Sequence, residues 1–247
     1  MKTLTAHQPA YLPWLGLFHK ISLADIYVFM DDRQYSTNDK YINKNYVFNK
    51  NKNQKHLLSV PLKTKGSMNI NIFDVLIDNS QEWQYKHFET IRHFYNKSRF
   101  YDEIIKFLEP FYNRKYYYFS DLAYDMLQMF LKILSINTII IKASDMNIFS
   151  NKNQYLIDIC KKTGSERYIF GEQGKKYIDK SLWEQNNIEC FIQSYVHPVY
   201  PQKNNCDGFV SHLSIIDLLF NVGMVDAKKI IFRNNIKNIG ECEKYGN

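Results

Sequence analysis

Residues 3–32 read TLTAHQPAYLPWLGLFHKISLADIYVFMDD, and this stretch decides the expected fold. The short apolar-leaning segment Thr3–Ala6 runs into a loop with two prolines, which a central strand or a helix interior does not accept. Apolar residues at near-helical spacing follow over Leu15–Ala24, and Ile26–Met30 is a continuous apolar run of strand length. This order predicts one βαβ unit, whose second strand is buried on both faces of a parallel sheet.

The rest of the chain repeats this alternation, apart from one helical stretch. Successive helical stripes over residues 81–135 predict a helical lobe inserted into a single α/β domain that spans residues 1–247. The polar, Asn- and Lys-rich residues 36–55 are expected to form a loop. Further strands are predicted at His56–Leu62, Ile70–Ile77, Thr138–Ile141, Tyr168–Phe170 and Glu189–Ile192. A further helix is predicted at Asn153–Thr163, with Gly164 as its C-cap. Another is predicted within Phe209–Asn221, with Ser214 as its N-cap and Gly223 as its end. The expected fold class is α/β, a mostly parallel, Rossmann-like sheet with flanking helices.

Composition and charge narrow the class of protein. Of 247 residues, 45% are hydrophobic, and 32 Lys and Arg against 25 Asp and Glu leave a net charge of +7. The excess is Lys dispersed among Asn, so it favours an anionic small molecule over nucleic acid as the partner. The four cysteines form no CxxC pair, and no signal peptide or apolar run of about 20 residues is present. We expect a soluble cytoplasmic protein with free thiols, no metal centre and no membrane insertion; a homodimer is left open.

Polar residues gather where predicted strands end, and ligands of open parallel sheets bind outside the carboxyl ends of strands. His7 and Gln8 follow the first strand and lead into the loop that carries Tyr11. The helix that begins near Leu15 would direct its positive N-terminal end to the same place, which suits a phosphate. His7 could bind that phosphate or act as an acid or base; the alternative is a structural turn.

Two further blocks follow predicted strands. Asp31 and Asp32 end the second strand, ahead of Gln34 and Tyr35. Paired acids at this position can hold Mg²⁺, bind ribose hydroxyls or act as a general base, or they form a solvated turn. The block GEQGKKY, residues 171–177, permits close backbone approach to an anion, or is a glycine-capped turn. Its candidate ligand contacts are Gly171, Lys175 and Tyr177.

The last block lies in an extended, proline-containing stretch that would present His197, Tyr200 and Gln202. Asp217 and Asn221 lie one turn apart on the following helix and share a face. These side chains either complete a site or satisfy a buried loop. No Gly-x-Ser-x-Gly elbow and no local Cys/His pairing is present, so nucleophilic hydrolysis is not expected.

Four motifs together resemble the WbqC-like protein family: HQPAYLPWLG (7–16), DIYVFMDDRQY (25–35), NKN (43–45) and LSIIDLLFNVG (213–223). The resemblance adds Asn43, Lys44 and Asn45 to the candidate binding residues. The chain departs from the family pattern at two places. Lys44 stands where the family tends to have Arg. The loop that begins at Gly171 stands where we expect a Ser/Gly-rich loop that contains an Arg. The family is linked to gene clusters for O-antigen, the lipopolysaccharide side chain, and other surface polysaccharides. The layout around His7 is also similar to HIGH-type nucleotidyl transferases, without their second His element.

The resemblance implies a role in this pathway. Our leading hypothesis for the reaction is a transferase that forms an acyl or aminoacyl amide on a nucleotide-linked amino sugar. Activation by ATP with Mg²⁺ is one route. Two alternatives stay open: a nucleotidyltransferase acting on a sugar phosphate, and a non-catalytic protein that holds a nucleotide sugar. In the leading hypothesis His7 contacts a phosphate or acts as an acid or base, and Asp31 or Asp32 binds a metal ion or deprotonates the sugar amine. Lys44 and Lys175 balance the phosphate charge. Tyr11 and Tyr35 stack on the base or the sugar.

Overall fold

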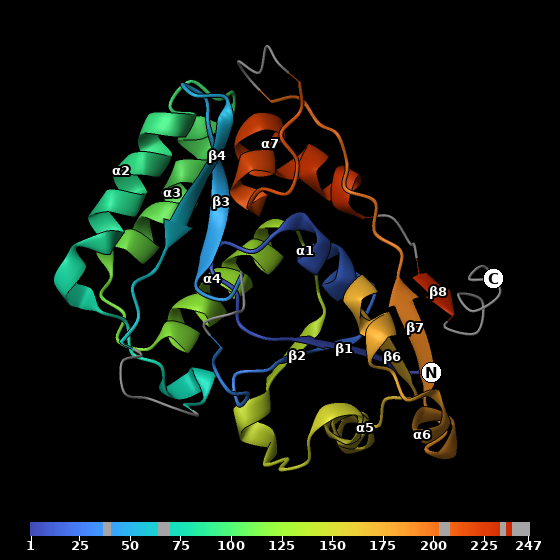
Figure 1. Cartoon of the computed structure of the whole chain (residues 1–247). Helices are drawn as coiled ribbons and strands as arrows, with labels where there is room; N and C mark the ends of the chain where they lie inside the picture. The colour runs from blue at the N-terminus through green and yellow to red at the C-terminus, as the bar shows by residue number, and fades with distance from the viewer. Residues whose placement is uncertain (37–40, 64–69, 203–207, 233–235, 239–247) are drawn as a thin grey trace.

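The computed structural model describes residues 1–36, 41–63, 70–202, 208–232 and 236–238 (Figure 1). Its main sheet has the strand order β5-β2-β1-β6-β7-β8, in which the first five are parallel and β8 is antiparallel to β7. The strands are β1 (Thr3–His7), β2 (Ile26–Phe29), β5 (Ile139–Lys142), β6 (Arg167–Phe170), β7 (Glu189–Gln193) and β8 (Ile236–Asn238). The predicted α/β class with a mostly parallel sheet is confirmed.

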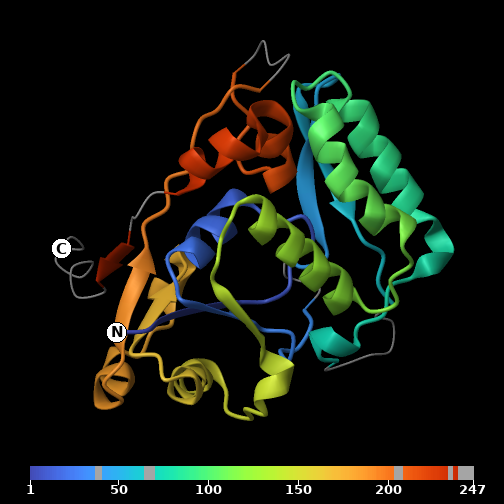
Figure 2. The ribbon, with the colours of Figure 1, turned by 180° about the vertical axis from the view of Figure 1, so that it is seen from behind.

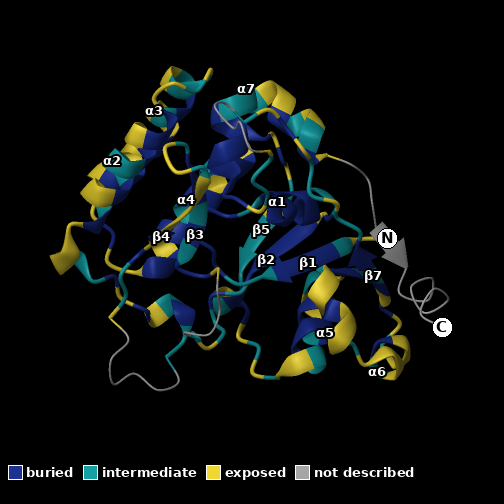
Figure 3. Ribbon diagram, turned by 45° about the horizontal axis from the view of Figure 1, so that its top comes forward, coloured by how far each residue is buried: buried dark blue, intermediate teal, exposed yellow. Residues whose placement is uncertain are grey.

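Helices cover both faces of this sheet. They are α1 (Leu15–Ser22), α2 (Trp83–Tyr95), α3 (Tyr101–Asn113), α4 (Phe119–Ile133), α5 (Lys152–Thr163), α6 (Lys180–Gln185) and α7 (Ile215–Ile231). Figure 3 shows α5 and α6 on one side of the sheet and α1 on the other. Alternate residues of β2 divide accordingly: Tyr27 and Phe29 join the core of α1, α4 and α7, whereas Ile26 and Val28 join that of α5 and α6.

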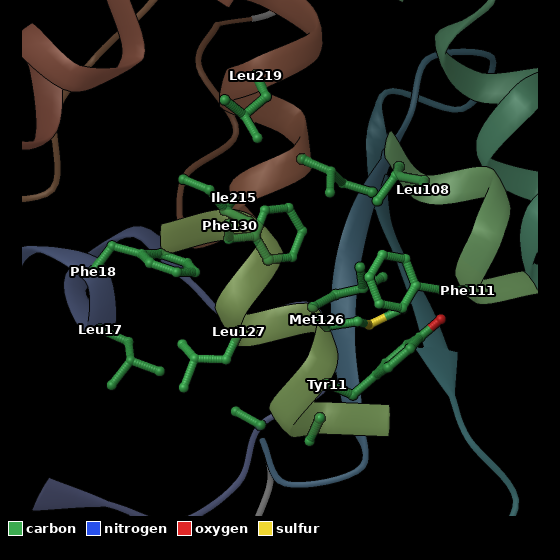
Figure 4. Packing of buried hydrophobic residues seen from close by; sticks show 14 of the residues in the cluster. Tyr11, Leu17, Phe18, Leu108, Phe111, Met126, Leu127, Phe130, Ile215 and Leu219 are labelled. Atoms are coloured by element: carbon green, nitrogen blue, oxygen red, sulfur yellow. The ribbon is translucent and has the colours of Figure 1, made fainter. Parts of the chain in front are cut away.

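The larger hydrophobic core lies between α1 and the helices α2, α3 and α4, which had been predicted to form an inserted lobe. Figure 4 shows Phe130 of α4 beside Phe18 of α1, with Ile215 of α7 next to them. The rings of Phe18 and Phe130 meet edge to face, with centroids 5.7 Å apart. Seen from behind, α4 lies next to the sheet while α2 and α3 stand farther out, beside a two-stranded hairpin over residues 44–59 (Figure 2).

That hairpin corrects the sequence prediction for residues 36–62. β3 (Lys44–Asn49) and β4 (Gln54–Ser59) pair antiparallel with each other and stay outside the main sheet. The expected loop over 36–55 therefore contains a strand, and the expected third strand of the sheet is one arm of a hairpin; residues 37–40 lie outside the described part. The alternation was hidden because Asn43, just before β3, and Asn45 within it are buried in place of apolar residues and bond to backbone carbonyls.

Among the predicted helix ends and short strands, some are confirmed and others are wrong. Gly164 caps α5 with φ 64°, and the Ser214 hydroxyl accepts from the Ile216 amide at the start of α7, both as predicted. Gly223 breaks α7 with φ 77°, ψ 174°, but the helix resumes afterwards. The strand predicted over residues 70–77 is wrong, because its centre is the short 3-10 turn Ile72–Asp74.

The order of the parallel strands creates a fork between β1 and β6. From β1 the chain moves through β2 to β5 on one side, and then returns to place β6 and β7 on the other side of β1. The last paired residues of β1 and β6 are Thr5 and Ile169, whereas β1 and β2 stay paired as far as His7 and Phe29. Such a reversal point opens a crevice at the carboxyl edge of the sheet.

Candidate functional site

The loop between β1 and α1 is fixed by backbone contacts at several points. The Tyr11 amide donates to the Ile42 carbonyl at 2.7 Å, and Asn45 Nδ2 donates to the Leu12 carbonyl at 2.6 Å. Leu12 takes a left-handed conformation, φ 44°, which such a clamp must hold because a side chain disfavours it. The loop is therefore a rigid support for the residue that precedes it, His7.

The starts of α1 and α7 lie against each other. Trp14 and Ser214, the residues before the two helices, form an antiparallel bridge, and the Ile215 amide donates to the Pro13 carbonyl at 2.8 Å. His212, two residues before Ser214, has a positive φ of 57°, and Leu12, two residues before Trp14, also has a positive φ. The two motifs recognised at 7–16 and 213–223 are thus partners in one structural unit at the carboxyl edge of the sheet.

His7 stands at the carboxyl end of β1, half-buried and neutral at pH 7. Its Nδ1 lies 2.8 Å from the Gln8 carbonyl, which can only accept, so Nδ1 carries the proton and Nε2 keeps its lone pair. Burial, with the nearby charge of Lys20, lowers the pKa of His7 to about 4, against the opposing effect of the Gln8 bond. Its ring meets Trp14 edge to face at 5.1 Å. His7 is a base with a free lone pair rather than a cation.

Side chains at the end of β7 and just after it pack over the start of α1. Gln193 Nε2 donates to the Gly16 carbonyl at 2.8 Å, and the Tyr195 ring lies directly on Gly16. A Cβ at Gly16 would come within 3.1 Å of Tyr195 Cδ1 and 3.3 Å of Trp14 Cδ1. A larger residue here would force the two aromatic rings to shift by a few tenths of an ångström.

Two histidines continue this arrangement. The rings of His197 and His212 stack with centroids 4.9 Å apart, and the His212 amide donates to His197 Nε2 at 3.3 Å. Burial, together with the neighbouring His212 and Lys55, lowers the pKa of His197 to about 4. We call the resulting surface the aromatic band; its members are Tyr41, His7, Trp14, Tyr195, His197 and His212.

The paired acids after β2 are bound to other side chains. Asp31 accepts from the Ser144 amide at 2.9 Å and from its hydroxyl at 2.8 Å, and burial raises the pKa of Asp31. Asp32 accepts two bonds from Arg33, at 2.8 and 3.0 Å, and one from the Tyr155 hydroxyl at 2.7 Å. Both carboxylates join β2 to the segments that follow β5, so the structure gives them positioning roles.

Tyr11, Asn43 and Asn45 lie inside the protein. Tyr11 is fully buried, and its hydroxyl lies 2.9 Å from His87 Nδ1 and 2.6 Å from the Tyr112 hydroxyl. Its ring has no free face for a ligand. Asn43 Nδ2 donates to the Val60 carbonyl at 2.8 Å, and Asn45 clamps the loop described above. These three residues hold the hairpin and the loop in place, which is a different role from ligand contact.

A second buried network surrounds Asp217. Its carboxylate accepts from the hydroxyls of Tyr95 and Tyr200, at 2.9 and 2.8 Å, and from Gln202 Nε2 at 2.9 Å. Asn221 Nδ2 donates to the Asp217 carbonyl at 2.7 Å. Burial raises the pKa of Asp217, and the three bonds to its oxygens oppose that rise. The network fastens residues 200–202 to α7 and α2, so of the last predicted block His197 alone belongs to the aromatic band.

The remaining predicted residues lie at the edges of the site or away from it. Gln8 is half-buried beside His7, while Gln34 and Lys175 are exposed and Lys44 is half-buried. Tyr35 donates to Asn43 Oδ1 at 3.4 Å, and Tyr177 contacts Phe170. Gly171 follows β6, and a Cβ there would meet no atom within 4 Å. Gly171 comes from a different predicted block than His7, but the strand order places both residues at the fork between β1 and β6.

Sequence reasoning did not select Trp14, Lys20, Tyr195 or His212 as site residues. Lys20 had a usable signal, because a lysine inside the apolar stripe of a helix is rarely buried without a reason. Tyr195 and His212 had none, since their contacts with Gly16 and His197 depend on how distant segments of the chain pack together. Within the described residues no group of three or more His, Cys, Asp and Glu could hold a metal ion, no helix could cross a membrane, and Cys160 and Cys190 are free buried thiols.

Comparison with known proteins agrees with the motif resemblance. A sequence model of the WbqC-like protein family matches residues 8–229. The chain is also 28% identical over 224 residues to the uncharacterized protein Rv1507c of Mycobacterium tuberculosis (strain ATCC 25618 / H37Rv), which covers 90% of this chain and 95% of that protein. No solved structure matches the chain. The chain belongs to the WbqC-like protein family.

Proposed function

We propose that this chain is an enzyme that transfers an acyl or aminoacyl group to the amino group of a nucleotide-linked amino sugar, as a step in surface-polysaccharide synthesis. The family resemblance supports the pathway. The position of His7 at the carboxyl edge, beside the fork of the sheet, supports a ligand site. The flat faces of the aromatic band suit a sugar or a nucleobase.

The observation that carries this proposal is the free lone pair of His7. In amide formation the sugar nitrogen forms a bond to the carbonyl carbon of an activated acyl donor, the donor's leaving group departs, and the nitrogen loses a proton. His7 Nε2 takes that proton and can return it to the leaving group. The lowered pKa of His7 keeps Nε2 unprotonated at neutral pH, and it also makes His7 a weaker base than an ordinary histidine.

This proposal moves the role of base from the paired acids to His7. The oxygens of Asp31 and Asp32 already accept bonds from Ser144, Arg33 and Tyr155. Because Tyr11 is buried, we likewise assign stacking on the ligand to Trp14 and Tyr195 instead. Charge balance by the half-buried Lys44 and the exposed Lys175 stays a prediction.

The test is activity of the purified full chain on a panel of nucleotide-linked amino sugars, each with acyl thioesters, or with amino acids plus ATP and Mg²⁺. We expect a product heavier than the acceptor sugar by the acyl group, detected by mass spectrometry. Failure of every acceptor and donor pair, together with no binding of any nucleotide sugar, would remove the proposal.

A second candidate is direct nucleotidyl transfer to a sugar phosphate, which the Rossmann-like strand order favours. Release of pyrophosphate from a nucleoside triphosphate, without amide product, would select it. A non-catalytic role as a nucleotide-sugar carrier predicts binding without turnover. Loss of product in His7→Ala at unchanged ligand affinity would exclude that role.

A further inference from the structure

Lys20 places a buried ammonium group in the fork between β1 and β6. The His7 carbonyl accepts from the Met30 amide on the β2 side, at 2.9 Å. Because successive carbonyls of a strand point to opposite edges, the Ala6 carbonyl points toward β6. Pairing with β6 has ended there, and Lys20 Nζ donates to the Ala6 carbonyl at 3.0 Å instead.

The positive charge of this ammonium group is poorly balanced by the protein groups around it. Lys20 is 5% exposed, and no carboxylate among the described residues lies within ion-pairing distance of it. Its bond to Ala6 uses one of three donors. A buried cation without an anionic partner is costly, and burial lowers the pKa of Lys20 to about 8. A carbonyl at the end of a strand needs only a neutral donor, so capping Ala6 does not explain a charge here.

The surroundings of the fork suit an incoming anion. His7, beside Lys20, is neutral and adds no competing carboxylate. Gly171 begins the loop that leaves β6, and no atom lies within 4 Å of where its Cβ would be. The first turn of α1 carries no acidic side chain and no side-chain cap. A ligand entering at the carboxyl edge would therefore meet Lys20 at the base of the fork.

We infer that Lys20 is a ligand-binding residue that pairs with an anionic group, a phosphate or a carboxylate, inserted between β1 and β6. This inference deepens the proposed function, since it assigns the anionic part of the substrate or donor to the fork and the reacting amine to His7. It concerns binding, so it stands or falls separately from acyl transfer.

The experiment is calorimetric titration of the full-length protein with inorganic pyrophosphate and, separately, with acetate. We compare wild type with Lys20→Met, which keeps the apolar stem, and Lys20→Arg, which keeps the charge. The matched control is Lys2→Met, because Lys2 also donates to a backbone carbonyl, that of Thr163 at 3.0 Å, but is exposed at the other end of β1. Circular dichroism verifies that each variant is folded.

Wild type and Lys2→Met are expected to bind at least one of the two probes, and Lys20→Met at least tenfold more weakly. Lys20→Arg should retain more of the affinity than Lys20→Met. Pyrophosphate as the better probe indicates a phosphate ligand, and acetate indicates a carboxylate. Equal affinity in wild type and Lys20→Met, or no binding of either probe to wild type, overturns the inference even if acyl transfer is found. Retained binding without turnover would instead count against the proposed function alone.

A second arm uses wild type only. Sulfate keeps one charge state over the range tested, so its affinity reports the protein. Since the pKa of Lys20 is about 8, affinity should be about tenfold weaker at pH 9 than at pH 7. A lysine with an ordinary pKa of about 10.4 would give almost no change. His7 on β1, Tyr27 on β2 and Tyr195, which packs on α1 at Gly16 and His19, do not titrate in this range, because burial lowers the pKa of His7 and raises those of both tyrosines. A flat profile contradicts the assignment.

Discussion

His7 owes its chemical state to its immediate neighbours. The Gln8 carbonyl fixes the proton on Nδ1, Trp14 packs edge to face with the ring, and burial keeps the imidazole neutral. The sequence could place a histidine after a strand, but it could not tell that its Nε2 stays free. Nor could it tell that Asp31 is satisfied, because the partner of Asp31, Ser144, is 113 residues away in the chain.

A second buried histidine makes stability depend on pH. His87 accepts from Tyr11 through Nδ1 while its other nitrogen bonds the Ser59 backbone, and burial lowers the pKa of His87 to about 4. The unfolded chain, with a pKa of about 6.5, takes up the proton first as the pH falls, so stability present above pH 6.5 is lost toward pH 4. Between pH 7 and pH 5 this residue should lower the unfolding free energy by about 2 kcal/mol.

Urea unfolding of wild type and His87→Gln at both pH values measures this contribution. His87→Gln should be less stable at pH 7 and lose about 2 kcal/mol less than wild type on going to pH 5. The control is His93→Gln, an exposed position on the same helix, α2. An identical pH dependence in wild type and His87→Gln would refute the assignment.

Gly16 is the point where the rings of Tyr195 and Trp14 approach the backbone of α1. In Gly16→Ala the new Cβ would press on Tyr195 and Trp14, both of which must shift. Alanine also improves helix propensity by up to about 1 kcal/mol, so the unfolding free energy should change by less than about 1 kcal/mol. The Michaelis constant for the sugar substrate should nevertheless rise several-fold. Steady-state kinetics with a melting curve separates the two effects, and an unchanged Michaelis constant would argue that the band does not touch substrate.

At the scale of elements, the sequence predicted what is locally periodic. The βαβ unit over residues 3–32 and the helices between 81 and 135 follow from apolar spacing, which does not depend on distant contacts. The hairpin of β3 and β4 escaped prediction because Asn43, Asn45 and Asn49 are buried in places where an apolar residue would have revealed the strand. Their amides are bonded to backbone groups, which removes the usual penalty for burying them.

The hairpin and the His7 loop depend on each other through Asn45. Its Nδ2 donates to the Leu12 carbonyl at 2.6 Å and its Oδ1 accepts from the Tyr46 amide at 2.8 Å. Asn45→Ala leaves both backbone groups buried without these bonds and should lower the unfolding free energy by about 2–4 kcal/mol. The control Asn51→Ala, at an exposed position near the turn of the same hairpin, should change it by less than about 0.5 kcal/mol. Equal denaturant midpoints for the two variants would contradict this coupling.

At the scale of the molecule, the site is a product of strand order. The sequence indicates which segments are strands but not that β6, more than 150 residues after β1, becomes its neighbour. That neighbour defines the fork, brings Gly171 toward His7 and leaves the Ala6 carbonyl to Lys20. Tyr195 and His197 reach the aromatic band because β7 lies one strand farther along. A single sequence carries no direct record of such long-range pairing.

The measurement that tests the account most directly is the rate of amide formation by wild type and His7→Gln on a nucleotide-linked amino sugar and an activated acyl donor, with His93→Gln as control. Loss of the base should lower kcat by about 10²- to 10⁴-fold, while the Kd for the nucleotide sugar stays within a few-fold of wild type. His93→Gln should match wild type in both. A His7→Gln protein that forms amide at the wild-type rate would contradict the assignment of His7 as the base at this site.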